Sequence, residues 1–346
     1  MAVKLKDIAQ DAGVSISTVS RILNNDLSRK SNEQTVAKVF ESAERLGYFA
    51  QKLAPARYME YKTEDKTFSV ACILTSEHET YVSPFFSDLL AGIQQEVINQ
   101  GPSFPHNFFV TYIKDPGFLK FIQNTRLDCA IMLGRTSLEN INMIKSSIPN
   151  LVYAGVNEIG HGIDEVLCDA HLAVMEAVEY LIGLGHRDIG FIGPTQVKHQ
   201  VFNEHRYQGF LDAMAKHAIP VSEKLVKDTI LTANDGYESM KELIRLETLP
   251  SALFCGNDTV AMGVMKALDE AGIAVPQDIS LVGFDNIDTC VYLKPTLTTI
   301  DIPKRELGRL AVKVLLDRLT SNRQYSIRVT IPFSLVVRDS CRAFTC

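Results

Sequence analysis

The chain has 346 residues, of which 46% are hydrophobic and 22% are charged, a composition that is typical of globular proteins. Its length suits two or three domains, and its apolar runs are far shorter than the roughly 20 residues that a membrane-spanning helix needs. The first residues contain no apolar signal-peptide stretch, so we expect a cytoplasmic protein with no membrane partner. The formal net charge of −6 divides into +3 for residues 1–62 and −9 for the remainder. A basic head on an acidic body favours contact with polyanions through the head alone.

The common catalytic and metal-binding patterns do not occur in this sequence. The seven cysteines are scattered and form no CxxC pair, which favours reduced cysteines packed as small hydrophobic side chains over a zinc site. There is no GxSxG, HExxH, GxxxxGKS/T or GxGxxG motif. We therefore expect no catalytic residues, no metal and no cofactor, and we do not expect an enzyme.

The first 48 residues are predicted to form three short helices. Apolar residues recur at helical spacing up to Gly13, a second helix follows Ser15, and a third follows Asn32. Ser15 and Asn32 are both residues that cap helix N-termini. Ala9 supplies the small residue needed where two helices cross, and Gly13 supplies a left-handed turn. The pattern predicts a helix-turn-helix within residues 1–48.

A polar linker over residues 49–66 is followed by short apolar runs that alternate with amphipathic helices. The strands that we predict cover residues 68–74, 107–113, 128–133, 151–156, 188–192, 252–255 and 279–284. Apolar strands of this kind are typical of a parallel sheet with helices on both faces, and so many strands fit two α/β lobes better than one. Within residues 67–346, we assign the first lobe to residues 67–161 and 301–322 and the second lobe to residues 162–300 and 323–342.

A helix-turn-helix would place the start of its second helix in the major groove of DNA. There Arg21 can make a bidentate contact to guanine, Ser17 a weaker polar contact, and Ile16 an apolar contact to a thymine methyl group. The alternative is a small three-helix domain in which Arg21 is an ordinary solvated charge. The complete pattern over residues 5–24 favours sequence-specific DNA binding.

Distinctive motifs recur in a fixed order along some 300 residues. They are Ala12-Gly13-Val14-Ser15, Thr18-Val19-Ser20-Arg21, Leu23-Asn24, Leu46-Gly47-Tyr48, Ser83-Pro84-Phe85-Phe86, Leu184-Gly185-His186-Arg187, Arg206 with Gly209-Phe210, Asn257-Asp258, Val282-Gly283-Phe284-Asp285 and Pro295-Thr296-Leu297-Thr298-Thr299-Ile300. This series resembles the LacI/GalR family of transcriptional regulators. The resemblance implies an all-α, lambda-repressor-like helix-turn-helix headpiece joined to an α/β, two-lobed, periplasmic-binding-protein-like sensor domain. It also implies a homodimer bound to a pseudo-palindromic operator, and the headpiece is most similar to the branch that regulates galactose or galactoside operons.

Further DNA contacts follow from the resemblance. The candidates for phosphate contacts, which position a headpiece without reading sequence, are Lys4, Ser15, Ser20, Asn24, Asn32 and Thr35. In many family members a hinge helix after the headpiece inserts a leucine into the minor groove. Here Arg57 stands at the usual leucine position, and Pro55 is unfavourable inside a helix. We expect an altered hinge in which Leu53 or Arg57 supplies any minor-groove contact.

Polar and aromatic residues stand near the ends of the predicted strands, and two-lobed α/β proteins bind ligands at the carboxyl ends of their strands. The candidate contacts, which by resemblance match the family's effector positions, are Ser83, Phe85, Phe86, Arg206, Asn257 and Asp285. Carboxylate, amide and guanidinium groups beside aromatic faces are the chemistry that recognises a sugar.

Competing roles remain open for several of these residues. Phe86 is alternatively a core residue, and Arg206 alternatively pairs with Asp285 across the lobes. The neighbouring Asp258 is interpreted as the cap of the helix that follows it rather than as a ligand contact. Gly155 stands where many relatives have an acidic residue, so one usual partner for a sugar hydroxyl is missing.

The favoured function is a repressor of a carbohydrate-utilisation operon that a sugar inducer releases from DNA by changing its operator affinity. One alternative is a regulator of the same fold that depends on a corepressor or a phosphoprotein. Another is a sugar-binding protein that does not bind DNA. The headpiece distinguishes these, because removal of residues 1–60 should abolish operator binding and leave ligand binding intact.

Overall fold

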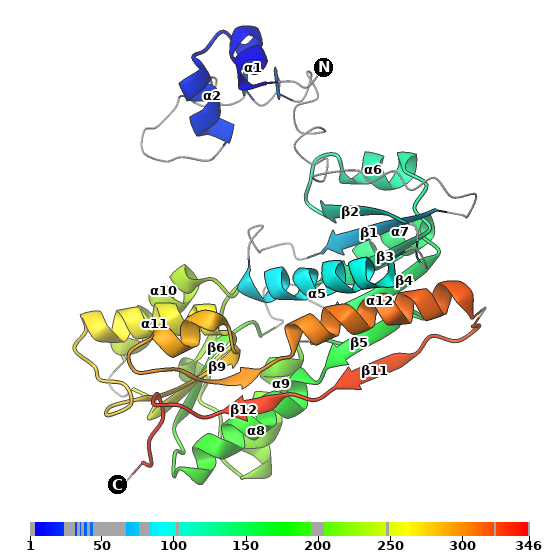
Figure 1. The fold of residues 1–346 in the computed structure, drawn as a ribbon. Helices are drawn as coiled ribbons and strands as arrows, with labels where there is room; N and C mark the ends of the chain where they lie inside the picture. Colours follow the sequence, from blue (N-terminus) through cyan, green and yellow to red (C-terminus); the bar gives the residue numbers. More distant parts are fainter. Residues whose placement is uncertain are drawn as a thin grey trace. The chain divides into compact units, whose positions relative to one another are not determined.

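This computed structural model of the protein describes residues 4–23, 32, 35, 38–39, 42–43, 67–75, 83–101, 104, 106–195, 204–246, 249–321 and 323–344. The chain divides into two compact units, residues 1–64 and residues 65–346, both drawn in Figure 1. The hinge candidates Leu53 and Arg57 and the phosphate candidate Asn24 lie outside the described residues. The third helix predicted for the headpiece also falls largely outside them.

The headpiece contains two short helices, α1 (Leu5–Ala12) and α2 (Ile16–Leu23). Gly13 lies between them with a φ of 67°, a left-handed conformation that glycine adopts without steric strain. The Ser15 hydroxyl accepts a hydrogen bond from the backbone N–H of Thr18 at 3.1 Å, as expected of a helix N-cap. The buried faces of both helices share one small core, which contains Ile8, Ala9, Val19, Ile22, Val39 and Ala43. The turn, the cap and the buried face of the predicted helix-turn-helix are all present.

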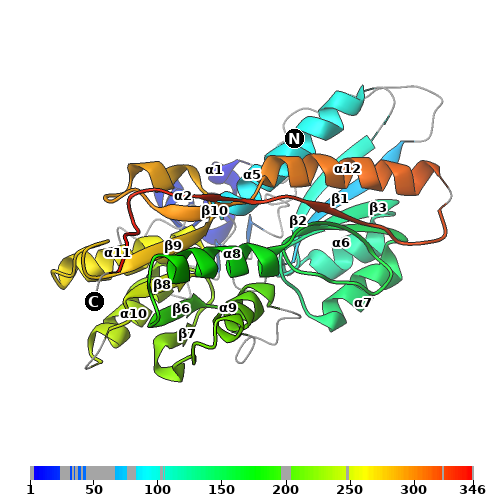
Figure 2. The same cartoon turned by 90° about the horizontal axis from the view of Figure 1, so that it is seen from below.

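Residues 65–346 form two lobes, each built on a six-stranded sheet (Figures 1 and 2). Lobe 1 contains β1 (Phe68–Leu74), β2 (His106–Tyr112), β3 (Cys129–Leu133), β4 (Asn150–Gly155), β5 (Asp164–Cys168) and β11 (Arg328–Ile331), in the spatial order β11-β5-β4-β3-β1-β2. Lobe 2 contains β6 (Ile189–Gly193), β7 (Val226–Asp228), β8 (Ala252–Cys255), β9 (Ser280–Asp285), β10 (Thr298–Asp301) and β12 (Ser334–Val336), in the order β12-β10-β9-β8-β6-β7. The described strand pairs are parallel, except that β10 and β12 run antiparallel.

Helices cover both faces of each sheet. Those of lobe 1 are α5 (Pro84–Gln100), which packs on α12 (Lys304–Thr320), and α6 (Phe118–Asn124), which packs on α7 (Leu138–Ser147). Those of lobe 2 are α8 (Ala170–Gly183), which packs on α9 (His205–Lys216), and α10 (Ala233–Ile244), which packs on α11 (Asp258–Glu270). The buried apolar side chains accordingly form separate clusters on the two faces of the lobe 1 sheet, one with α5 and α12 and one with α6 and α7. Among the described helices, none is long and apolar enough to cross a membrane.

The border between the lobes differs from the sequence prediction, which ended the first part of lobe 1 at residue 161 and gave residues 323–342 to lobe 2. Strands β5 and β11 pair with each other, and β5 pairs with β4, so both strands belong to lobe 1. The sequence prediction lacks β5 because this buried strand begins with two carboxylates, Asp164 and Glu165. In the structure the Asp164 carboxylate accepts two hydrogen bonds from the guanidinium of Arg323, at 2.8 and 2.9 Å. A bidentate pair of this kind allows a buried strand to begin with an acidic residue.

We expect Gly308→Ala to destabilise lobe 1, because a Cβ at this position of α12 would overlap the backbone of Leu89 in α5. Overpacking of this kind lowers the free energy of unfolding by about 1–3 kcal/mol, which urea or thermal unfolding measures. Gly183→Ala in α8 is the matched control, because no atom lies within 4 Å of the added Cβ and alanine favours a helix over glycine. Equal stability of the two variants would contradict the close helix packing.

Candidate functional site

The second helix of the headpiece has one packed face and one solvent-facing side. Val19 and Ile22 are buried in the small core. Ile16 is 49% exposed, a large value for an apolar side chain, and Ser17 is exposed next to it. The first turn of α2 is therefore accessible to a partner, as DNA recognition by this helix requires.

Of the other predicted DNA contacts, Lys4 and Ser15 precede α1 and α2, and Ser20 lies within α2. Lys4, Ser15 and Asn32 are exposed, and Ser20 and Thr35 are half-buried. The Ser15 hydroxyl is already engaged, since it lies 2.8 Å from the hydroxyls of both Ser17 and Thr18. Arg21 belongs to α2, but its side chain is outside the described part of the chain. The roles of these residues in reading bases or holding phosphates stay predictions.

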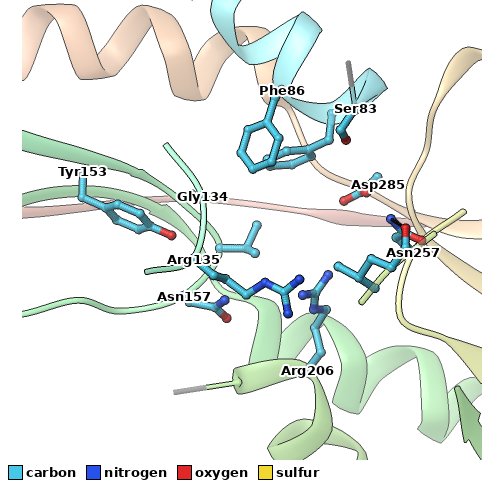
Figure 3. Close-up of a pocket in the computed structure, with 13 residues that line it drawn as sticks. Ser83, Phe86, Gly134, Arg135, Tyr153, Asn157, Arg206, Asn257 and Asp285 are labelled. Atoms are coloured by element: carbon cyan, nitrogen blue, oxygen red, sulfur yellow. Dashed lines mark hydrogen bonds between the residues drawn. The ribbon is translucent and has the colours of Figure 1, made fainter. Parts of the chain in front are cut away.

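All six predicted effector contacts line one pocket in residues 65–346 (Figure 3). Ser83, Phe85 and Phe86 come from the start of α5, Arg206 from the first turn of α9, Asn257 from the residue before α11, and Asp285 from the end of β9. Both lobes thus contribute walls to this pocket, which is the usual place of a ligand site in two-lobed α/β proteins.

The two adjacent phenylalanines differ in burial. Phe85 and Phe86 form an edge-to-face pair with 5.2 Å between ring centroids. Phe85 is 8% exposed and belongs to the core of lobe 1, whereas Phe86 is half-buried and packs against that core. The core role that was an alternative for Phe86 therefore describes Phe85 better.

Arg206 forms an ion pair with a residue that the sequence analysis does not single out. Its Nε donates to Oε1 of Glu204 at 2.7 Å, and its Nη1 donates to the backbone oxygen of Gly256 at 2.9 Å. Glu204 is 1% exposed. Burial alone would raise the pKa of Glu204, but the positive charges of Arg206 and Arg135 outweigh burial and hold this pKa below its usual value. Glu204 is therefore ionised at neutral pH.

A second arginine connects Glu204 to the other lobe. Arg135 follows strand β3 of lobe 1, and its Nη1 lies 3.1 Å from Oε2 of Glu204 at the start of α9 in lobe 2. The Arg135 side chain is 11% exposed and the Glu204 side chain 0%. The carboxylate thus joins the two walls of the pocket. Arg135 could have been found from sequence by its place directly after a strand, but Glu204 carries no such signal.

Helix α11 begins at Asp258, and Asn257 is its N-cap, with Oδ1 accepting from the backbone N–H of Val260 at 2.8 Å. The cap role predicted for Asp258 is therefore wrong. Asp258 is fully buried and accepts hydrogen bonds from the Thr299 hydroxyl at 2.6 Å and from the Ile287 N–H at 2.9 Å. Burial raises the pKa of Asp258 to about 6, although these hydrogen bonds oppose the rise. A shift of one residue in the helix start, which the sequence does not determine, explains the difference.

Asp285 lies in a strained turn at the end of β9. Its φ is 108°, a conformation that costs about 1–3 kcal/mol for a residue other than glycine. The Lys304 ammonium group donates to the backbone oxygens of Asp285, Asn286 and Ile302 and so holds the turn in place. Strain that is held in this way is typical of functional sites.

Apart from Gly155, the rest of the pocket wall was not singled out in the sequence analysis. It consists of Gly134, Arg135, Tyr153, Gly155, Val156, Asn157 and Leu231. Within the described residues, no group of three or more His, Cys, Asp or Glu side chains is arranged to hold a metal ion.

Comparisons with known proteins support the same division of the chain. A family model described as bacterial regulatory proteins, lacI family, matches residues 4–51, and one described as a periplasmic binding protein-like domain matches residues 178–341. The HTH-type transcriptional repressor PurR of Actinobacillus pleuropneumoniae serotype 3 (strain JL03) is 32% identical, over 98% of this chain and 98% of its own. A solved LacI family transcriptional regulator from Enterococcus faecium with bound ribose is 26% identical, with a TM-score of 0.68 over 80% of this chain and 100% of that one. The lac repressor dimer bound to operator and the anti-inducer ONPF is 22% identical, with a TM-score of 0.69 over 99% of this chain and 100% of that one.

The fold and the pocket define a class of protein in which a helix-turn-helix headpiece precedes a two-lobed, periplasmic-binding-protein-like domain. The match to a curated relative along nearly the whole length then shows the family. The chain belongs to the lacI family of bacterial regulatory proteins and is a DNA-binding transcriptional repressor. The predicted fold class, the family resemblance and the prediction of a regulator rather than an enzyme are confirmed.

We expect Arg135→Gln to loosen the contact between the two pocket walls, because it removes the pair between lobes and leaves the Glu204–Arg206 pair in place. Backbone amides of residues 134–137 and 204–208 should then exchange with solvent roughly tenfold faster, which hydrogen–deuterium exchange mass spectrometry measures.

Lys216→Gln is the matched control for this experiment. It breaks a pair with Glu179 that lies within lobe 2 and whose side chains are 59% and 32% exposed. Such a surface pair contributes about 0–1 kcal/mol, so exchange at the pocket should not change. If Arg135→Gln also left exchange unchanged on both sides of the pocket, the pair would not hold the lobes together.

Proposed function

We propose that this repressor binds a pseudo-palindromic operator as a homodimer and that a sugar bound in the pocket between its lobes changes its operator affinity. The observation that carries the proposal is the convergence of Arg206, Asn257 and Asp285 with the ring of Phe86 on a single pocket. A carboxylate accepts hydrogen bonds from sugar hydroxyls, a guanidinium donates them, and an amide does both. An aromatic face covers the apolar C–H surface of a sugar ring.

Two of the similar proteins support a sugar as the ligand and a dimer as the form that binds the operator. The Enterococcus faecium regulator, which is 26% identical to this chain, has ribose bound, and the lac repressor binds its operator as a dimer. In our proposal Ile16, Ser17 and Arg21 read base edges. The phosphate contacts come from Lys4, Ser15, Ser20, Asn24, Asn32 and Thr35. Minor-groove contact, where present, comes from Leu53 or Arg57. A protein that binds an operator acts in the cytoplasm.

For the sign of regulation we propose induction, in which the sugar releases the repressor from the operator. A ligand changes operator affinity only as far as it binds the two conformations of the protein differently. The contact between Glu204 and Arg135 joins the lobes directly at the pocket, so a ligand placed there alters the contact that sets their arrangement. We further propose galactose or a galactoside as the sugar, because the headpiece sequence is most similar to the branch of the family that regulates galactose or galactoside operons.

The test is a thermal-shift screen with monosaccharides, disaccharides and sugar phosphates, followed by operator binding with and without each ligand found. The operator is first selected from random duplexes with the full-length protein. We expect a neutral sugar to raise the melting temperature and to weaken operator binding by about 5–150-fold. A ligand that tightens operator binding would instead establish a corepressor.

We expect Arg21→Ala to weaken binding to the selected operator by about 1–3 kcal/mol and to relax the preference at one base position, because a bidentate guanine contact is lost. Fluorescence anisotropy at several salt concentrations measures this effect.

Lys4→Ala is the control variant, because loss of a phosphate contact should weaken binding uniformly across sequences. It should also reduce the slope of log K against the logarithm of the salt concentration by about one. An Arg21→Ala protein with unchanged sequence preference would exclude Arg21 as a base-reading residue.

A further inference from the structure

Asn157 is a buried polar residue in the pocket wall, and the sequence analysis assigns it no role. It follows strand β4 in lobe 1, lines the pocket and is 3% exposed. Neither its Oδ1 nor its Nδ2 has a hydrogen-bond partner in the described part of the chain. Figure 3 shows Asn157 next to Arg135, across the pocket from Asn257 and Asp285. Burial of an amide is unfavourable unless its hydrogen bonds are made, so this side chain is suited to a partner that enters the pocket.

Apart from Arg135, the groups of lobe 1 that line the pocket around Asn157 carry no charge. A Cβ at Gly155 would overlap the hydroxyl of Tyr153, so this position of the wall has no room for a side chain while Tyr153 keeps its place. Burial raises the pKa of Tyr153, although a hydrogen bond from the Asn157 backbone opposes the rise. The phenol is therefore uncharged at neutral pH. Lobe 1 thus presents an uncharged amide and an uncharged phenol to the pocket.

We propose that Asn157 is a ligand-contacting, specificity-determining residue of this pocket, and that it pairs with two adjacent hydroxyls of a neutral sugar. Its Oδ1 accepts a hydrogen bond from one hydroxyl while its Nδ2 donates to the next, and each hydroxyl both donates and accepts. Such a contact uses both unpartnered atoms at once. The inference rests on the proposed effector function and adds to it the class of ligand and the group that the ligand must present to lobe 1.

The experiment compares Asn157→Leu with the full-length wild-type chain. Leucine has nearly the shape of asparagine and no polar atoms, so the ligand-free variant should melt at the same temperature as the wild type or higher. Thermal shift and calorimetry with D-ribose, D-galactose and cellobiose then measure binding. We expect at least one of these sugars to bind the wild type, and we expect its Kd to rise roughly tenfold or more in Asn157→Leu, because a hydrogen-bonded subsite is lost.

Asn150→Leu is the matched control, because this residue at the start of β4 already donates from its Nδ2 to the backbone oxygen of Asp128 at 3.0 Å. It should melt at a lower temperature than the wild type and keep its sugar affinity. A deoxy analogue that lacks one of the two hydroxyls should bind the wild type more weakly, but it should bind Asn157→Leu as well as the parent sugar does.

Three outcomes would overturn the inference. If ligand-free Asn157→Leu melts at a lower temperature, as Asn150→Leu is expected to, the amide is satisfied in the unliganded protein and its role is structural. If Asn157→Leu keeps the wild-type Kd, the residue does not contact the ligand. If none of the three sugars binds the wild type, the ligand class is wrong. Operator binding, measured in parallel, distinguishes these failures from failure of the proposed repressor function.

Discussion

The arrangement of the ligand pocket depends on one buried carboxylate. Glu204 lies between the guanidinium groups of Arg206, in its own lobe, and Arg135, in the other lobe. A buried carboxylate is stable in its charged form only while its partners remain in place, because the low-dielectric interior penalises an unpaired charge heavily. The same carboxylate thus takes part in the ionisation of the pocket wall and in a contact between the lobes. A ligand that hydrogen-bonds either arginine acts on both at once.

A second set of contacts connects the pocket to the segments that join the lobes. Asn286, next to the strained Asp285, donates from Nδ2 to Oδ1 of Asp301 at 2.9 Å and accepts from Nη2 of Arg338 at 2.7 Å. Asp301 ends β10 just before the chain passes to lobe 1, and Arg338 follows β12 after the chain has returned to lobe 2. Asn286 therefore links the turn that contains Asp285 to two of the connections between the lobes. The ligand that we propose would act on the lobe arrangement by this route.

Whether a residue could be predicted from sequence depended on whether its role is local. Gly13 and Ser15 were predictable because a left-handed turn and a helix cap are determined by a few neighbouring residues. Asp285 was placed correctly because the carboxyl end of a strand is recognisable in an apolar run. Glu204 was missed because its role depends on Arg135, 69 positions away in the sequence. The strand β5 was missed for the same reason, since its acidic start is stabilised by Arg323, 159 positions further on.

Two residues of the pocket wall depart from local preferences. Asp285 has a backbone conformation that suits glycine, and Asn157 buries an amide without a partner in the described part of the chain. In the headpiece, Gly13, Ser15 and the buried core of α1 and α2 agree with local rules. Selection for stability alone would remove the unfavourable groups in the pocket, and an apolar side chain at residue 157 would be enough to remove one of them. The buried amide of Asn157 is accounted for by our proposal that a ligand completes the hydrogen bonds it lacks within the described residues.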